Sequence, residues 1–162
     1  FHTFINDVRD LTRAVGEPIY AWIGHSAGGL AMMRARTLYR VHAERYVCIS
    51  APLYPYVPLD SFRQQAGADD ETLEYVKPIL AEQFQTTWTA LTKGQSYQPE
   101  DDARLLAIYD RDDEKVRHED ADRIAELWPG TSVMKTETYG HNRILRAQEV
   151  WDAVAGFLQP DS

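Results

Sequence analysis

Cysteine is scarce in this chain of 162 residues, in which Cys48 is the single example. One thiol can form neither an internal disulfide nor a cysteine-rich zinc site, so we expect neither feature. A chain without disulfides is typical of the reducing cytoplasm, which is the compartment we predict. Long apolar runs are lacking as well, and none approaches the roughly 20 residues that a membrane-spanning helix needs. We therefore expect no membrane span.

Positive charge is the second shortage. The chain has 17 lysine and arginine residues against 25 aspartate and glutamate residues, which gives a formal net charge of -8. Such a surface repels a polyanion, and no dense basic run offers a local exception. The composition therefore argues against a nucleic-acid partner. Disordered and low-complexity classes are excluded too, because 44% of the residues are hydrophobic and can fill a core.

Short apolar runs alternate with helical patterns along the chain. Four runs are typical of buried strands, in residues 19–23, 45–50, 105–109 and 131–136. Helical spacing of apolar residues occurs around them, in residues 1–15, 30–40, 120–128 and 146–158. Strands that alternate with helices form βαβ crossovers, so we predict an α/β fold with a mainly parallel sheet and helices on both faces. The length fits one domain, residues 1–162.

The first helical pattern begins at the first residue. Its apolar positions follow the i, i+3, i+4, i+7 spacing of an amphipathic helix. They are Phe1, Phe4, Ile5, Val8, Leu11 and Val15. No capping residue precedes this pattern. We therefore expect the chain to be the C-terminal part of a longer protein.

Residues 53–99 form a long connection between two predicted strands. Pro55 and Pro58 at its start exclude the interior of a sheet, and we interpret the segment as largely irregular. One helix is predicted through Phe84, because the acidic residues 69–71 would lie beside its positive terminus. Pro78 should kink or divide this helix. Long segments of this kind are usually functional, so we predict a cap or lid over a site.

The sharpest motif is Gly24-His25-Ser26-Ala27-Gly28, followed by Gly29. It fits the pattern Gly-x-Ser-x-Gly and lies between a predicted buried strand and a predicted helix, the context of a nucleophile elbow. A serine at such a turn has a strained backbone, and small neighbours let the strand and the helix approach. Ser26 is therefore the candidate nucleophile. We expect His25 to pack or to line a pocket.

A nucleophilic serine needs a base, and the base needs an acid that orients it. His141 follows the fourth predicted strand and is the candidate base, with His118 as the nearest alternative. The acid should follow the third predicted strand, where we choose Asp113 because it stands three residues before an apolar anchor. Asp110 and Asp112 of the same cluster remain alternatives.

Three segments in this order resemble the α/β-hydrolase fold family. They are GHSAGG after IYAWI, the strand and acidic cluster LLAIYDRDDEKV, and YGH after SVMKT. The resemblance spans nearly the whole chain and implies Ser26 as nucleophile, Asp113 as acid and His141 as general base. A serine at the elbow argues against the epoxide-hydrolase and haloalkane-dehalogenase branches, which use a carboxylate nucleophile. Many relatives carry proline where this chain has Arg117.

The resemblance also implies parts of the fold that precede this sequence. The family's early strands are missing, and so is the loop that supplies the second backbone donor of the oxyanion hole. The first donor is the backbone N–H of Ala27. Without the early strands, residues 19–23 become an apolar sheet edge. We expect upstream residues or another chain to cover this edge.

Together these features predict a serine hydrolase that cleaves a carboxylic ester or a related acyl substrate through a Ser-His-Asp catalytic triad and an acyl-enzyme intermediate. This chemistry needs no cofactor and no metal. Tyr54, Tyr56 and Trp88 are predicted to line an apolar acyl or alcohol pocket. The alternative is a catalytically impaired hydrolase-like domain that binds a ligand or a partner without turnover, because the second oxyanion donor is missing.

Overall fold

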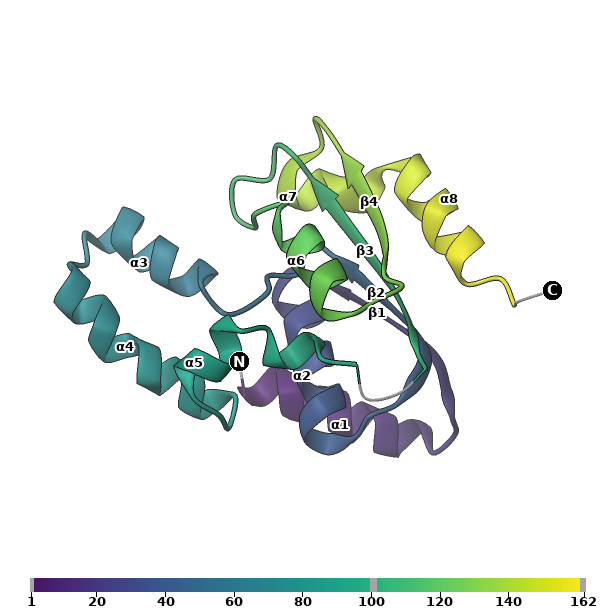
Figure 1. Ribbon diagram of the computed structural model, residues 1–162, viewed down its shortest axis with the longest axis horizontal. Helices are drawn as coiled ribbons and strands as arrows, with labels where there is room; N and C mark the ends of the chain where they lie inside the picture. The colour runs from purple at the N-terminus through teal and green to yellow at the C-terminus, as the bar shows by residue number, and fades with distance from the viewer. Residues whose placement is uncertain (1, 100–101, 161–162) are drawn as a thin grey trace.

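The computed structural model describes residues 2–99 and 102–160 of the chain. These residues form a four-stranded sheet in the order β1-β2-β3-β4, in which every neighbouring pair is parallel (Figure 1). The strands are β1 (Ile19–His25), β2 (Ala43–Ile49), β3 (Arg104–Asp110) and β4 (Ser132–Thr136). The mainly parallel sheet predicted from the alternating pattern is therefore confirmed.

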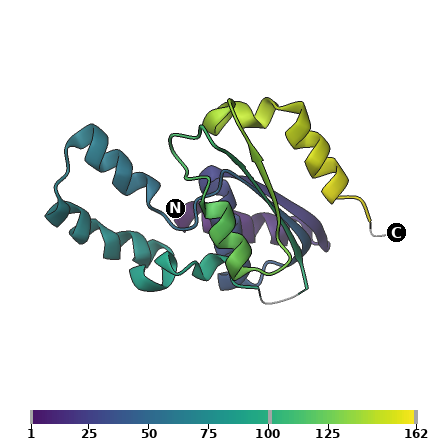
Figure 2. The same ribbon diagram turned by 45° about the horizontal axis from the view of Figure 1, so that its top comes forward.

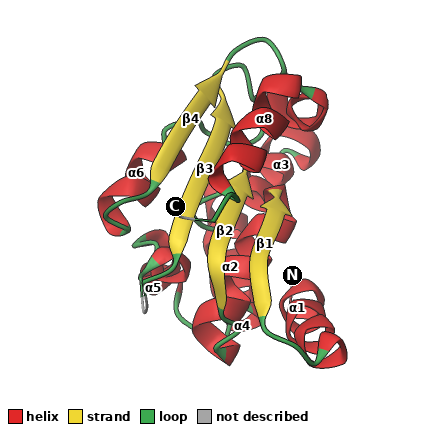
Figure 3. Cartoon of the chain, turned by 90° about the vertical axis from the view of Figure 1, so that its right-hand side faces the viewer, coloured by secondary structure: helices red, strands yellow, loops and turns green. Residues whose placement is uncertain are grey.

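Helices cover both faces of this sheet (Figure 3). They are α1 (His2–Val15), α2 (Ser26–Tyr39) and α6 (Asp120–Leu127) on one face, and α8 (Gln148–Phe157) on the other. Tyr46 and Cys48 of β2 belong to the core under the first group, and Val47 and Ile49 belong to the core under α8. Because successive side chains of a strand point to opposite faces, each central strand fills both cores. This is why the buried strands show no polar alternation.

The outer strand β1 is more exposed than predicted. Among the described strands it pairs with β2 alone, and Tyr20 and Ile23 are 40% and 44% exposed. The prediction that residues 19–23 are buried on both faces is therefore wrong for this chain. In the described residues no strand pairs with the outer edge of β1, and apolar side chains of this strand are exposed, as expected of an apolar edge.

The predicted first helix is present as α1, but only part of its apolar side is buried. Ile5 is 1% exposed and joins the core, whereas Phe4, Leu11 and Val15 are each more than half exposed. Phe1 lies outside the described residues. The spacing therefore predicts the helix correctly without predicting how much of its apolar side is covered.

The segment 53–99 is mostly helical, so the prediction of an irregular stretch is wrong. It contains α3 (Val57–Ala66), α4 (Asp70–Gln83), α5 (Trp88–Thr92) and the short 3₁₀ helix η1 (Gln95–Tyr97). Pro58 stands in the first turn of α3, where a missing N–H removes no helical hydrogen bond. A proline that argues against a strand here helps to begin a helix.

α4 begins where the acidic residues predict. The side chain of Asp69 accepts a hydrogen bond from the N–H of Thr72 (2.8 Å) and caps the helix. Pro78 lies inside α4, which continues to Gln83, so the helix is not divided. One proline removes a single helical hydrogen bond, and the bonds of the flanking turns hold the helix together.

α3 and α4 lie side by side and project away from the sheet (Figures 1 and 2). The segment 53–99 returns to the body of the protein at Phe84 and Gln85. Their carbonyl oxygens accept hydrogen bonds from the guanidinium group of Arg34 in α2, at 2.8 and 3.2 Å. Arg34 is 4% exposed. This buried contact fixes the end of α4 to the helix that begins at Ser26.

Candidate active site

Ser26 lies at the sharp turn between β1 and α2. It is the first residue of α2, it directly follows the last residue of β1, and its φ angle is +52°. Residues other than glycine rarely adopt this left-handed conformation, and it costs free energy. The backbone therefore has the strain that the motif predicts at this position. In a strand-turn-helix of this kind the serine side chain stands at the tip of the turn.

Gly24 and Gly29 allow β1 and α2 to approach each other. A Cβ atom on Gly24 would lie 2.5 Å from the Cα of Gly29, and one on Gly29 would lie 2.6 Å from the Cβ of Ala51. Both distances are well inside the roughly 3.5 Å of a carbon–carbon contact. A Cβ atom on Gly28 would meet nothing within 4 Å. The close approach therefore depends on Gly24 and Gly29, and the second glycine of the motif itself is not sterically required.

Ser26, His141 and Asp113 form one hydrogen-bonded chain. The Nε2 atom of His141 lies 2.9 Å from the Oγ of Ser26, and its Nδ1 atom lies 2.8 Å from the Oδ2 of Asp113. His141 belongs to the short helix α7 (Gly140–Arg143) after β4, and Asp113 belongs to the turn after β3. The side chain of Asp113 is fully buried, and that of His141 is 10% exposed. The structure thus brings together three residues that were chosen from separate strand ends.

Asp113 is held in its charged form. Burial raises its pKa, but hydrogen bonds from His141 and from the N–H groups of Lys115 and Val116 (2.8 and 2.9 Å) outweigh burial and leave the pKa below its usual value. Because a carboxylate only accepts hydrogen bonds, the proton in this contact belongs to the Nδ1 atom of His141. The Nε2 atom then serves as the acceptor for the hydroxyl of Ser26. The arrangement is suited to remove a proton from Ser26.

The other two aspartates of the cluster hold the turn that precedes His141. The carboxylate of Asp110 accepts hydrogen bonds from the hydroxyl of Thr136 (2.7 Å) and from two N–H groups of the turn 138–140 (3.1 and 2.9 Å). Asp112 accepts from the remaining N–H of that turn (2.9 Å). Burial raises the pKa of Asp110, but its hydrogen bonds outweigh burial and lower the pKa overall. The two alternative acids thus support the backbone, and the carboxylate beside the ring of His141 is that of Asp113.

His25 has a role that the sequence did not reveal. Its Nε2 atom lies 2.9 Å from the backbone oxygen of His141, and the two imidazole rings are 4.8 Å apart. Burial lowers the pKa of His25. Because a carbonyl oxygen only accepts hydrogen bonds, the Nε2 atom of His25 donates its proton to this oxygen. The residue before Ser26 therefore holds the backbone of the candidate base. His118, the alternative base, lies beside Glu119 with a separation of 3.4 Å.

Ala27 offers a backbone donor beside Ser26. It is the second residue of α2, and the first N–H groups of a helix have no partner within the helix. The same end carries the partial positive charge of the helix dipole. The N–H of Ala27 is thus suited to meet negative charge that develops near Ser26.

Similarity to known proteins lies in the three-dimensional structure. No protein-family model matches the chain, and no curated protein matches it in sequence. Among solved structures, monoacylglycerol lipase from Paleococcus ferrophilus matches with a TM-score of 0.61, 16% identity and coverage of 95% of this chain and 73% of its own. Alpha/beta hydrolase domain-containing protein 10 from mouse matches with a TM-score of 0.62, 14% identity and coverage of 96% and 69%. A bromoperoxidase from Bacillus anthracis matches with a TM-score of 0.64, 14% identity and coverage of 96% and 72%. The chain has the α/β-hydrolase fold.

Within this α/β-hydrolase fold, Tyr54, Tyr56 and Trp88 border one cavity of about 200 Å³. The ring of Tyr54 lies 5.0 Å from that of Tyr56 and 5.7 Å from that of Trp88. The rest of its wall comes from α3, α4 and the turn after β3 and is mostly charged, so the prediction of an apolar pocket is wrong for this cavity. The charged residues are Asp60, Arg63, Asp70, Glu74, Lys77 and Arg117. The three aromatic residues predicted from the sequence thus lie together. The hydroxyl of Tyr56 is engaged within the protein, 2.8 Å from the carboxylate of Asp120.

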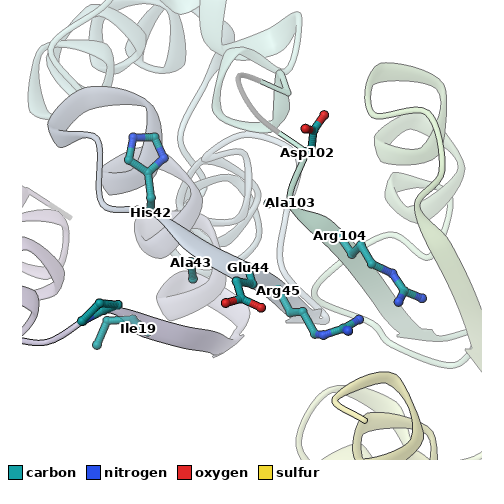
Figure 4. A pocket seen from close by; sticks show the side chains of 9 residues that line it. Ile19, His42, Ala43, Glu44, Arg45, Asp102, Ala103 and Arg104 are labelled. Carbon is teal, nitrogen blue, oxygen red and sulfur yellow. The ribbon is translucent and has the colours of Figure 1, made fainter. Parts of the chain in front are cut away.

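A second cavity, of about 800 Å³, lies at the opposite end of the α/β-hydrolase sheet (Figure 4). The first residues of β1, β2 and β3 border it, whereas Ser26 follows the last residue of β1. Arg45 and Arg104 at its border lie over the ring of Phe157 in α8, both within 6 Å. Ligands of open α/β sheets bind at the carboxyl ends of the strands. We therefore place the candidate active site at the end that holds Ser26.

In the part of the chain that the structure describes, no helix combines the length and the apolar character needed to cross a membrane. The same residues contain no group of three or more histidine, cysteine, aspartate or glutamate side chains arranged to hold a metal ion.

Proposed function

We propose that the protein is a serine hydrolase that cleaves a carboxylic ester or a related acyl substrate. The observation that carries this proposal is the continuous chain from Ser26 through His141 to Asp113, with distances of 2.9 and 2.8 Å. A nucleophile, its base and the acid that orients the base need this order and this spacing. Structural similarity to a monoacylglycerol lipase supports the same chemistry.

Each group has one role in the proposed reaction. His141 takes the hydroxyl proton as the Oγ of Ser26 attacks the carbonyl carbon, and Asp113 stabilises the imidazolium that forms. The carbonyl electron pair moves onto oxygen, and the N–H of Ala27 donates to this oxyanion. Collapse of the intermediate expels the alcohol, which receives the proton from His141. Water activated by His141 then cleaves the acyl-enzyme and restores Ser26.

We also propose that the segment 53–99 is a cap that helps to bind the substrate. Its aromatic residues Tyr54, Tyr56 and Trp88 border the cavity of about 200 Å³ between this segment and the turn that follows β3. The aromatic rings would bury the apolar part of an acyl or alcohol group, and the charged side chains of the wall would contact its polar part. The turn after β3 also carries Asp113, so the proposed pocket and the proposed triad share one loop.

A fluorophosphonate probe tests the proposal directly, because it reacts with a serine that a base activates. We expect covalent labelling of the wild-type protein and hydrolysis of p-nitrophenyl esters. Both should disappear in Ser26→Ala. The matched control is Ser132→Ala, which removes an exposed hydroxyl at the start of β4 and should leave labelling unchanged.

A folded wild-type protein that neither reacts with the probe nor hydrolyses esters would overturn the proposed function. Binding of an ester analogue without turnover would then favour the alternative, a hydrolase-like domain that binds its ligand unchanged. Circular dichroism of the same samples establishes that they are folded.

A further inference from the structure

A buried group of hydrogen bonds joins the turn after β3 to the start of the segment 53–99. The hydroxyl of Tyr56 donates to the Oδ2 atom of Asp120 (2.8 Å), and the N–H of Leu53 donates to the same oxygen (2.9 Å). The hydroxyl of Tyr56 in turn accepts the backbone N–H of Arg117 (2.9 Å). Tyr56 is 2% exposed and Asp120 is 6% exposed. Water therefore hardly competes for these contacts.

The proposed chemistry does not use this group. Asp120 stands in the first turn of α6, and its partners are Tyr56 and a backbone N–H group at the start of the segment 53–99. Burial of its carboxylate raises the pKa of Asp120. At neutral pH, burying this charged group therefore contributes unfavourably to the free energy of folding. A buried carboxylate of this kind is tolerated only while its hydrogen bonds are made.

Three consecutive backbone N–H groups connect the hydrogen bonds of Tyr56 and Asp120 to Asp113. The N–H groups of Lys115 and Val116 donate to the Oδ1 atom of Asp113, at 2.8 and 2.9 Å. The next N–H along the chain is that of Arg117, which donates to Tyr56. Val116 between them is fully buried. The other carboxylate oxygen of Asp113 faces His141, so any shift of this short turn also shifts the contact with the base.

We propose that Tyr56 and Asp120 are positioning residues that hold the turn 113–117, and with it the carboxylate of Asp113, against His141. The proposal rests on the proposed function, in which Asp113 orients the base. Tyr56 directly precedes α3 and Asp120 lies in α6, so the contact fixes the acid-bearing turn to two separate elements. The orientation of Asp113 thereby depends on the hydroxyl of Tyr56 and the carboxylate of Asp120, and neither group contacts His141.

The first experiment is Tyr56→Phe, which removes the hydroxyl and keeps the ring. We expect kcat for a p-nitrophenyl ester to fall about 10- to 100-fold with little change in KM, because small displacements of catalytic groups have effects of this size. In an Asp113→Asn background, Tyr56→Phe should lower kcat less than threefold, since the residue acts through Asp113. An equal loss in both backgrounds, or no loss in the wild-type background, would overturn the proposal.

The second experiment compares Arg117→Pro with Arg117→Ala. Both remove the guanidinium group, which lies over the ring of Tyr56 and 3.3 Å from Asp60, but only proline also removes the N–H. We expect kcat of Arg117→Pro to be at least tenfold below that of Arg117→Ala. Equal values would contradict the proposal. This pair also carries the test if Tyr56→Phe does not fold.

A measurement without turnover separates this proposal from the proposed function. The NMR signal of the Nδ1 proton of His141 reports its hydrogen bond with Asp113 whether or not the protein hydrolyses esters. We expect this signal in the wild-type protein and its loss or faster exchange in Tyr56→Phe. If the wild-type protein is not labelled by fluorophosphonate but the signal responds in this way, the proposed function fails and the positioning role stands. An unchanged signal overturns the positioning role.

Discussion

Gly24 and Gly29 determine how closely the turn at Ser26 lies against the sheet. Their Cα atoms leave no room for a side chain, since a Cβ atom at either position would lie within 2.6 Å of a neighbour. Ser26 itself is held at a φ angle of +52°, so the strain of the turn and the close approach of β1 and α2 occur within six residues. The geometry of the candidate nucleophile therefore depends on residues that have no functional group.

We predict opposite outcomes for two neighbouring glycines. Gly29→Ala should lower the free energy of unfolding by about 1–3 kcal/mol, the usual cost of overpacking, because the new Cβ collides with that of Ala51. Gly28→Ala should be neutral or stabilise the protein by up to about 1 kcal/mol, since alanine favours the helix and meets no neighbour. Urea unfolding measures both changes. Similar decreases in the free energy of unfolding for the two variants would contradict the conclusion that Gly29, and not Gly28, is required for the close approach of β1 and α2.

The identity of the acid gives a second prediction at this scale. Asp113→Asn should lower kcat for an ester by about 10⁴, because an amide cannot hold His141 in the tautomer that accepts from Ser26. Asp112→Asn, one residue earlier, removes a carboxylate that accepts from the N–H of Thr138, and its effect on kcat should be at least a hundredfold smaller. Steady-state kinetics decide between them. A larger effect of Asp112→Asn would show that Asp113 is not the acid that orients His141.

The sequence predicts single residues of the site unevenly. Ser26 could be chosen because the motif, the preceding strand and the following helix all point to one position. The acid could not be decided from the sequence alone, because three aspartates stand within four positions after one strand and only their side-chain directions separate them. The contacts of His25 and Asp120 were not foreseen, since both depend on backbone groups that are distant in the sequence.

At the scale of elements, the turn 138–140 is held to the end of β3 by carboxylates. Asp110 accepts from two of its N–H groups and from Thr136, and Asp112 accepts from the third. Positive φ angles at Thr138 and Gly140 show that this turn is tightly constrained. The position of His141 in α7 therefore depends on the charge of Asp110.

The hydrogen bonds that Asp110 accepts predict a pH dependence of stability. The pKa of Asp110 is lowered in the folded protein, so its stabilisation is present above the unfolded value of about 3.9 and is lost as the pH falls through the folded value. The free energy of unfolding should decrease between about pH 5 and pH 2, and less steeply in Asp110→Asn. The control is Asp7→Asn on exposed α1, which should keep the wild-type slope. Equal slopes for wild type and Asp110→Asn would contradict the claim that the charged carboxylate of Asp110 stabilises the folded protein.

The aromatic wall of the segment 53–99 gives a prediction for the same scale. Trp88→Ala should raise KM for a p-nitrophenyl ester with a long acyl chain about tenfold, with kcat changed less than threefold, because the ring borders the proposed pocket and not the triad. Phe62→Ala is the control, since this exposed ring borders a different hollow between α3 and α4. A fall in kcat without a change in KM would argue against a binding role.

Elements could be predicted where periodicity is long and were missed where proline dominated. The four strands and α1, α2, α6 and α8 follow from apolar patterns that the structure contains. α3 was missed because Pro55 and Pro58 indicate a break, and the sequence does not show that Pro58 stands in a first helical turn. The predicted division of a helix at Pro78 was wrong for a similar reason, since α4 continues through this residue.

At the scale of the whole molecule, β1 is the outer strand of the sheet and pairs with β2 alone among the described strands. Its side chains Ile23 and Tyr20 are 44% and 40% exposed. Strand edges of this kind pair with other chains. We predict that Ile23→Lys reduces self-association of the 162-residue chain in light scattering at high concentration. Its effect on the free energy of unfolding should stay within about 0.5 kcal/mol.

The control for this edge is Tyr75→Lys, which changes a side chain that is 73% exposed on α4, away from the sheet edge. It should leave self-association unchanged. If both substitutions reduce association equally, net charge and not the strand edge is responsible.

The three residues of the hydrogen-bonded chain are far apart along the polypeptide, and Ser26 and His141 have a sequence separation of 115 residues. They meet only when β1, β3 and β4 have each taken their place in the sheet. Contacts between such distant positions form late, because long loops must close first. During refolding, reactivity of Ser26 toward a covalent probe should therefore recover after the far-ultraviolet signal of the helices. The rate at which labelling recovers would then measure the rate of the last step of folding.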